Sequence, residues 1–203
     1  DAAEAQGRDL DAAQALAGLA VNLGTDGSED FTGAHRDIAL ARAKLARIGG
    51  NALLDARLAF VEGQVLYYED KPSEAEVAMR RAIELSQKAF GPDDPMVGKS
   101  WGTLAGILQG LGRHDEQLAA AQQALASLKR AYGDVHPLVA TALGTVGTAL
   151  ADLGRFDEAR AMLHAADDMF RSIFGPDYPD RASTEAVLGN LEIGGAIGGL
   201  GAE

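Results

Sequence analysis

The sequence predicts an all-α fold of stacked antiparallel helix hairpins, and two observations support this prediction. Hydrophobic residues make up 47% of the 203 residues but aromatic residues only 5%. Most of the apolar content is therefore small or aliphatic, which favours close-packed helices over a β sandwich. In addition, two short motifs that punctuate helices recur at a fixed interval of 42 residues.

The first motif, aromatic-Gly-x-x-x-Pro, marks the end of one helix and the start of the next. It occurs at residues 90–95, 132–137 and 174–179. Its glycine can adopt the left-handed conformation that ends a helix, and its proline suits a first helical turn. A second series, in phase with the first, joins the two helices of each hairpin at residues 70–74, 112–116 and 154–158. All six prolines fall in these motifs, so none interrupts a helix.

These motifs predict four hairpins and a capping helix within a repeat domain over residues 1–194. The first unit, about 10–49, is divergent, with one helix from about Leu10 to Leu23 and another within 31–49. Later units are expected at about 51–91, 95–133 and 137–175, followed by a capping helix over 179–193. Residues 195–203 are glycine-rich, and we expect a flexible tail. The expected N-caps of the second helices are Ser73, Asp115 and Asp157.

Equivalent positions one period apart carry side chains suited to a common core. The predicted inward positions are Ala82, Ala124 and Ala166 on the second helices, and Leu66, Leu108 and Leu150, Leu104 and Val146, and Trp101 and Leu143 on the first helices. Glu62 is an exception at the position of Leu104. Because an unpaired buried carboxylate is costly, we expect either a cation partner or a helix rotation that turns Val61 inward.

The capping helix has glutamates where earlier units have core residues. Glu185 and Glu192 occupy the positions that Trp101 and Leu108 hold two periods earlier. Charge on an uncovered last helix is typical of an array that ends there, so both glutamates are expected to be exposed. Simple divergence of the last unit is the alternative.

The pattern resembles a tetratricopeptide repeat array of the 42-residue kind found in kinesin light chains. The residues that carry the resemblance over 53–192 are the Trp101/Leu143 position, small Ala105 and Gly147, turn glycines Gly112 and Gly154, and the alanine at 82, 124 and 166. Similar arrays follow the kinase domain of many bacterial serine/threonine kinases. The resemblance implies a right-handed superhelical solenoid of about nine helices. It also implies a non-catalytic protein-binding or scaffolding module of a larger cytoplasmic signalling protein, with a kinase as the expected parent.

Composition and motifs argue against several other functions. Eighteen Lys and Arg against thirty Asp and Glu give a net charge of -12, which disfavours nucleic acid and anionic membrane surfaces as partners. The chain has no cysteine, and its four histidines form no metal-binding spacing. His114 and His136 fall in turns, where exposure is expected. No nucleophile motif or phosphate loop is present, and no apolar stretch is long enough for a membrane span. We therefore expect no catalytic residue, cofactor or metal.

Because the chain begins at Asp1 without a methionine, we expect a processed chain or a fragment.

The resemblance places the binding groove along the first helix of each unit. The expected groove residues are Arg57, Phe60, Gln64 and Tyr67, then Lys99, Gly102, Gly106 and Gln109, then Thr141, Gly144, Thr148 and Asp152, with Ser183, Ala186 and Asn190 extending into the cap. Arrays of this kind often carry asparagines that clasp a peptide backbone, but the corresponding positions here are Val61, Thr103 and Thr145.

Two features of these positions indicate the ligand. Arg57 and Lys99 form a basic strip one period apart, and the glycines leave a low floor. We expect a peptide or protein segment with an acidic group beside an apolar anchor. Self-association through another face, or sensing of a small ligand or peptide in the groove, are the alternatives.

Overall fold

The computed structural model describes residues 2–25, 30–175 and 184–191, and this part of the chain is built of helices without strands. The helices are α1 (Ala2–Thr25), α2 (Phe31–Arg47), α3 (Ala52–Tyr68), α4 (Pro72–Phe90), α5 (Pro95–Gly110), α6 (His114–Tyr132), α7 (Pro137–Asp152) and α8 (Phe156–Phe174). Residues 184–191 are also helical. The prediction of an all-α fold with about nine helices is therefore confirmed. None of the described helices is long and apolar enough to span a bilayer.

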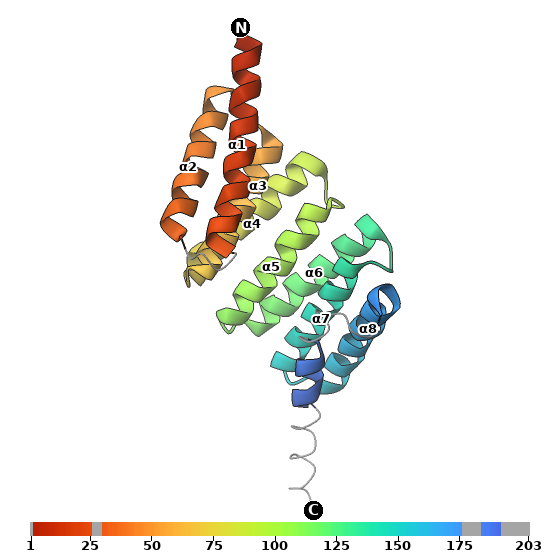
Figure 1. The fold of residues 1–203 in the computed structure, drawn as a ribbon. Coiled ribbons are helices and arrows are strands. Elements are labelled where there is room, and N and C mark those ends of the chain that lie inside the picture. Colours follow the sequence, from red (N-terminus) through yellow and green to blue (C-terminus); the bar gives the residue numbers. More distant parts are fainter. Residues whose placement is uncertain (1, 26–29, 176–183, 192–203) are drawn as a thin grey trace, which may run out of the picture.

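The helices pack as a series of hairpins that follow one another along the chain (Figure 1). Each odd-numbered helix packs on the next even-numbered one, and α4–α5 and α6–α7 contacts join neighbouring hairpins. The first helices also contact one another in series, α1 with α3, α3 with α5, and α5 with α7. They therefore line one common side of the array, which confirms the predicted solenoid.

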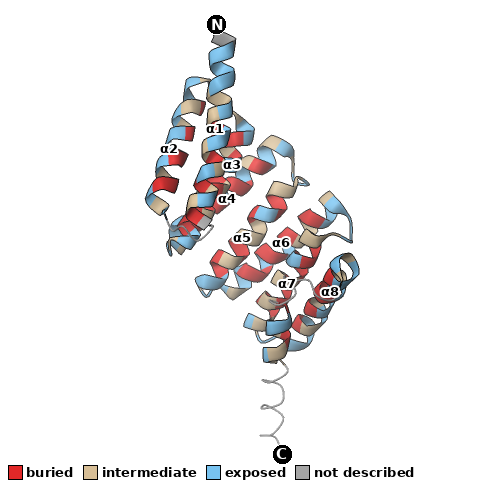
Figure 2. Ribbon diagram, viewed as in Figure 1, coloured by how far each residue is buried: buried red, intermediate tan, exposed pale blue. Residues whose placement is uncertain are grey.

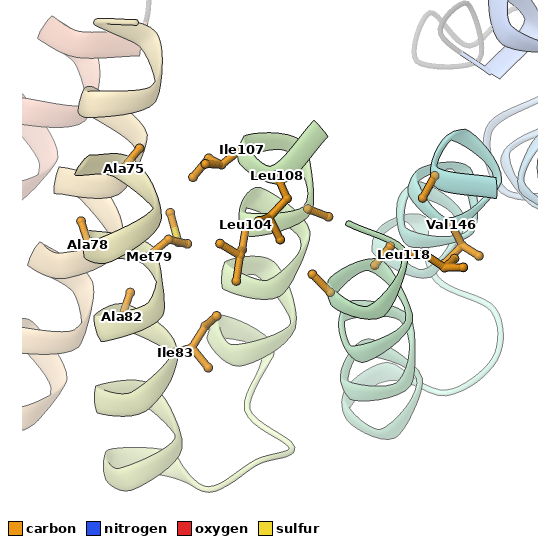
Figure 3. Packing of buried hydrophobic residues seen from close by; sticks show 14 of the residues in the cluster. Ala75, Ala78, Met79, Ala82, Ile83, Leu104, Ile107, Leu108, Leu118 and Val146 are labelled. Carbon is orange, nitrogen blue, oxygen red and sulfur yellow. The ribbon is translucent and has the colours of Figure 1, made fainter. Parts of the chain in front are cut away.

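The core follows the predicted repeat positions. Ala82, Ala124 and Ala166 are at most 1% exposed, and Leu104, Leu108, Val146 and Leu150 are also buried. Figure 3 shows Met79 and Ile83 of α4 pointing toward α5, and Leu118 of α6 near Val146 of α7. Trp101 packs against the same cluster, which is the predicted inward side, but it is only half-buried, whereas the equivalent Leu143 is buried. Buried residues lie on the faces where helices meet (Figure 2).

Glu62 is accommodated in both of the ways that its position suggested. Val61 is 2% exposed and takes the inward position. Glu62 itself accepts two hydrogen bonds from the Arg42 guanidinium of α2, at 2.9 and 2.5 Å. These bonds raise the pKa of Arg42 despite its partial burial. The first hairpin is thus linked to α3 by an ion pair in addition to the apolar contacts of Ile38 and Leu45 with the buried face of α3.

The predicted N-caps of the second helices are wrong. Helices α4, α6 and α8 begin at Pro72, His114 and Phe156, and their capping residues make no side-chain cap bond. The expected caps Ser73, Asp115 and Asp157 therefore lie inside the first turn. There the two aspartates act through the positive helix end rather than through a capping hydrogen bond. A residue in the left-handed conformation precedes each of these helices, and the helix begins two residues after it, before the expected cap. This residue is Asp70, at φ 59°, in the first case and Gly112 and Gly154 in the later units.

The C-terminal cap is described only in part. Glu185 is exposed as predicted, whereas Thr184 and Leu188 of the same helix are buried. Glu192, Ser183, the ends of the predicted 179–193 helix and the predicted tail 195–203 lie outside the described residues.

His136 has a structural role that its turn position did not reveal. Its Nδ1 accepts a hydrogen bond from the Leu138 backbone N–H at 3.1 Å and so caps α7. Its ring stacks on Tyr132, with centroids 3.9 Å apart and planes within 5°. His114 is also half-buried, with its Nδ1 3.1 Å from the Gln117 side-chain oxygen. The expectation that both imidazoles are solvated is therefore wrong.

We predict that His136→Ala lowers the free energy of unfolding by about 1 kcal/mol, because it removes the α7 cap. His136→Asp should lose clearly less, since Asp94 caps α5 in the same way one period earlier, with its carboxylate 2.8 Å from the Met96 N. Urea unfolding followed by circular dichroism measures both. Equal losses in the two variants would show that stacking, not capping, is the contribution of His136.

Ser86 is an irregularity in the core. It occupies the position of Leu128 and Phe170 in later repeats, is 0% exposed, and its hydroxyl has no hydrogen-bond partner. The buried Ser127, in contrast, donates to the Pro92 carbonyl at 3.0 Å.

We predict opposite effects of removing these two hydroxyls. Ser86→Ala should raise the free energy of unfolding by about 1 kcal/mol, because an unsatisfied buried hydroxyl is removed. Ser127→Ala should lower it by about 1 kcal/mol, because the Pro92 carbonyl loses its donor. Thermal and urea unfolding of both variants against wild type test the pair, and a loss of stability in Ser86→Ala would contradict the assignment.

Candidate functional site

Two adjoining cavities open on the side lined by the first helices. The larger, here called the C-terminal cavity, has a volume of about 630 Å³ and lies between α5, α7 and residues 184–191, against side chains of α6 and α8. The smaller, the central cavity, has about 370 Å³ and lies between α3, α5 and α7 against α6. Gly102, Thr141 and Thr145 line both. The two cavities therefore form one continuous groove.

Most of the predicted groove residues line these cavities. Gly102, Gly106, Gln109, Thr141, Gly144 and Thr148 line the C-terminal cavity, and Phe60, Gln64, Lys99, Gly102 and Thr141 line the central one. Arg57 and Tyr67 are exposed on α3 but line neither cavity. The same holds for Ala186 and Asn190 in the C-terminal helix. Asp152 does not line a cavity either, but it bonds to two residues that do.

The second helices also contribute to the cavity lining, which the sequence pattern of the first helices did not predict. Gln117 of α6 and Leu163 and Phe170 of α8 reach the C-terminal cavity from behind, and Thr184 and Val187 close its end. Of the three positions compared with the asparagines of related arrays, Thr103 and Thr145 line the groove, whereas Val61 is buried. The periodic equivalence of Phe170 and Leu128 could have revealed this contribution, since both lie on second helices at the same position.

The groove threonines are acceptors rather than donors. The hydroxyls of Thr141, Thr145 and Thr148 donate to the carbonyls of Pro137, Thr141 and Gly144, at 3.1, 3.0 and 3.0 Å. Each hydroxyl proton is thus used within α7. The lone pairs of these oxygens remain for donors from outside the helix.

Asp152 ends α7 and is held by two glutamine amides. Gln109 and Gln117 donate from their Nε2 atoms to the same oxygen, Oδ2, at 2.8 and 2.9 Å. Gln117 is 1% exposed. These bonds link the C-terminal ends of α5 and α7 at the rim of the C-terminal cavity.

The two edges of the groove have opposite charge. Arg57 and Lys99 lie in the first two turns of α3 and α5, whereas Asp152 lies at the C-terminal end of α7. Because the first helices alternate with antiparallel partners, their N-terminal ends share one edge. Helix dipoles have the same sign as these side chains, positive at N-termini and negative at C-termini. Arg57 and Lys99 are exposed and form no ion pair with described residues.

The helical glycines in this region differ in whether packing requires them. A Cβ added at Gly147 would lie 2.6 Å from the Leu163 Cγ and 3.3 Å from the Ala159 carbonyl oxygen, so packing requires glycine or a shift of α8. A Cβ at Gly106 would meet nothing within 4 Å. Glycine in a helix interior costs about 1 kcal/mol relative to alanine. Gly106 therefore leaves space in the cavity without any packing requirement.

Within the described residues, no three His, Asp or Glu side chains gather as a metal site would require. The groove thus offers hydrogen-bond acceptors and apolar surface, with a cationic edge on one side and the Asp152 carboxylate at the opposite rim. This chemistry suits binding of a chain segment.

Comparisons with known proteins agree with this architecture. A tetratricopeptide repeat family model matches residues 56–130, 96–166 and 138–194. The fold is similar to that of BtubC (BKLC) from P. vanneervenii, at 15% identity and a TM-score of 0.67, covering 92% of this chain and 82% of that one. It is also similar to the nearly identical TPR-like repeats of a kinesin light chain from Podospora anserina. The identity is 16% and the TM-score 0.70, and the match covers 88% of this chain and 84% of that one. No curated protein matches the sequence. The predicted resemblance to kinesin-light-chain arrays is confirmed at the level of the fold.

We predict that Gly106→Ala raises the free energy of unfolding by about 1 kcal/mol, because helix propensity improves and nothing clashes. Gly147→Ala should lower stability instead, since α8 must move to admit the methyl group. Chemical denaturation of both variants is the measurement. If Gly106→Ala destabilises the chain, the space above Gly106 is not open.

Proposed function

This chain belongs to the tetratricopeptide repeat family, and we propose that it is a non-catalytic module that holds a peptide or protein segment in its groove. Arrays of this family serve as protein-interaction modules, and their fold is typically non-catalytic. The proposal places the module in a larger cytoplasmic signalling protein, where it would regulate or scaffold. A serine/threonine kinase is the parent protein that the resemblance suggests.

The observation that carries the proposal is the hollow groove itself. Gly106 lowers the floor of the C-terminal cavity although no neighbouring atom requires a glycine there. At Gly102 the nearest atom to an added Cβ is the Ala124 Cβ, at 3.9 Å, which is ordinary contact. A helix that gives up propensity without a packing reason is consistent with space kept for something bound.

The central cavity supports a ligand with an acidic group beside an apolar residue. Lys99 lies at its edge, and Phe60 and Leu138 provide apolar surface. Arg57 is on the same edge one period earlier. Because the chain has a net charge of -12, an anionic segment is repelled by most of the surface and concentrates at this basic edge.

We predict that the double variant Arg57→Glu with Lys99→Glu abolishes binding of the native partner and leaves helix content unchanged, because both side chains are exposed. The matched control is Arg81→Glu with Lys88→Glu, which makes the same charge change at exposed positions of α4 outside both cavities. Quantitative pull-downs from lysate of the source organism, with all three proteins in parallel, identify partners that need the groove.

A partner recovered equally by wild type and the groove variant does not bind at the basic edge. If all recovered partners behave so, the groove is not the recognition site. Light scattering of the isolated chain tests the alternative function, self-association. Dimers that form in wild type and in both variants would favour a scaffold that self-associates through another face.

A further inference from the structure

We propose that the C-terminal cavity accepts a lysine or arginine side chain of the bound protein segment, with Asp152 as its counter-ion. This inference rests on the proposed function and names a second feature of the ligand. The ligand would then carry an acidic group for the Lys99 edge and a basic group for the Asp152 edge.

The first argument is the arrangement of Asp152. Both glutamine amides bond to Oδ2, which leaves Oδ1 without a donor among the described residues. Gln117 is buried, and its side-chain oxygen is in turn 3.1 Å from the His114 Nδ1. Because an amide oxygen accepts and an amide nitrogen donates, these hydrogen bonds run in one direction. His114 donates to Gln117, and Gln117 donates to Asp152. Asp152 and Gln109 are themselves exposed, so the buried Gln117 holds this carboxylate in position at the rim of the cavity.

The second argument is charge. Elsewhere on this array, carboxylates that bridge helices do so with cations, as Asp9 does with Arg47, Glu62 with Arg42, and Glu76 with Arg113. Asp152 also bridges helices, but its donors within the described part of the chain are neutral amides. No lysine or arginine of that part lines the C-terminal cavity. The carboxylate therefore gives this cavity a negative potential that a ligand cation would neutralise.

The third argument is the threonine row of α7. Because the three hydroxyl protons are committed to α7 carbonyls, the oxygens of Thr141, Thr145 and Thr148 offer acceptors to the cavity. An ammonium or guanidinium group has donors and no acceptors, and so complements them. A ligand carboxylate would find no donor in this row.

The shape of the cavity suits a long basic side chain. Lys and Arg lay their methylene stems along apolar surface and keep the charge near polar groups. Leu163, Phe170 and Val187 provide such surface in the C-terminal cavity, and its volume of about 630 Å³ is ample for one side chain and part of its backbone. Since Gly102, Thr141 and Thr145 line both cavities, one extended segment can reach the basic edge and Asp152 together.

The experiment begins with selection of binders from a random 12-residue peptide library on the immobilised full chain. Selected peptides are expected to contain both acidic and basic residues. The tightest peptide is then measured by fluorescence anisotropy against wild type, Asp152→Asn and the control Glu84→Gln, which removes one exposed carboxylate from α4 outside both cavities.

Asp152→Asn should weaken binding by about fivefold, as expected for loss of an ion pair at an exposed carboxylate, and Glu84→Gln should not. Replacing the basic peptide residue by norleucine should weaken binding to wild type by a similar factor. Combining both changes should cause little further loss, which identifies the two groups as partners. The norleucine peptide tests the inference on unmodified protein, so it holds even if Asp152→Asn is misfolded.

The outcomes separate the two proposals. Peptides that need Arg57 and Lys99 but contain no basic residue, or that bind Asp152→Asn as tightly as wild type, would overturn this inference and leave the proposed function standing. Peptides that bind the Arg57→Glu, Lys99→Glu variant equally well would overturn the proposed function. Absence of any selected peptide would overturn both.

Discussion

Each of the last three hairpins depends on one close approach, where the first helix meets the second at a position occupied by a small residue. Gly63, Ala105 and Gly147 hold this position in successive units. A Cβ on Gly63 would lie 2.7 Å from the Met79 Cε, and one on Gly147 would lie 2.6 Å from the Leu163 Cγ. Because the two helices are this close, Met79 and Leu163 pack directly over the backbone of the first helix, whereas other large residues such as Ile83 join one hairpin to the next.

This division of packing explains why the groove is hollow. Second helices pack against the first helices of the following unit, and so those interfaces are filled by residues such as Ile83 and Ile107. Successive first helices meet one another less extensively, and Gly102, Gly106 and Gly144 provide no side chains to fill the space between them. The cavities are thus a consequence of the solenoid geometry together with local absence of side chains. A bound segment would supply the missing contacts.

Charge gives this groove a direction that its shape alone does not have. The chain is strongly acidic, but many of its carboxylates are neutralised by ion pairs within and between hairpins. Arg57 and Lys99 on one edge and Asp152 on the other are not neutralised in this way within the described residues. The helix termini reinforce both signs. Recognition would therefore depend on the order of charges in the ligand as well as on apolar contact.

The sequence by itself determined the helical class, the motifs that separate the later helices and the inward faces, because glycine and proline motifs and apolar periodicity act over a few residues. The first helix was predicted too short, since α1 begins at Ala2 and not at about Leu10. It also indicated most cavity-lining positions of the first helices. Only the tertiary structure decided the Arg42–Glu62 pair, the Gln109–Asp152–Gln117 network and the reach of Leu163 and Phe170 into the groove. These features join residues that lie about twenty or more apart along the chain, or on the far helix of a hairpin. Their proximity depends on how the hairpins stack and curve, which a repeat period does not specify.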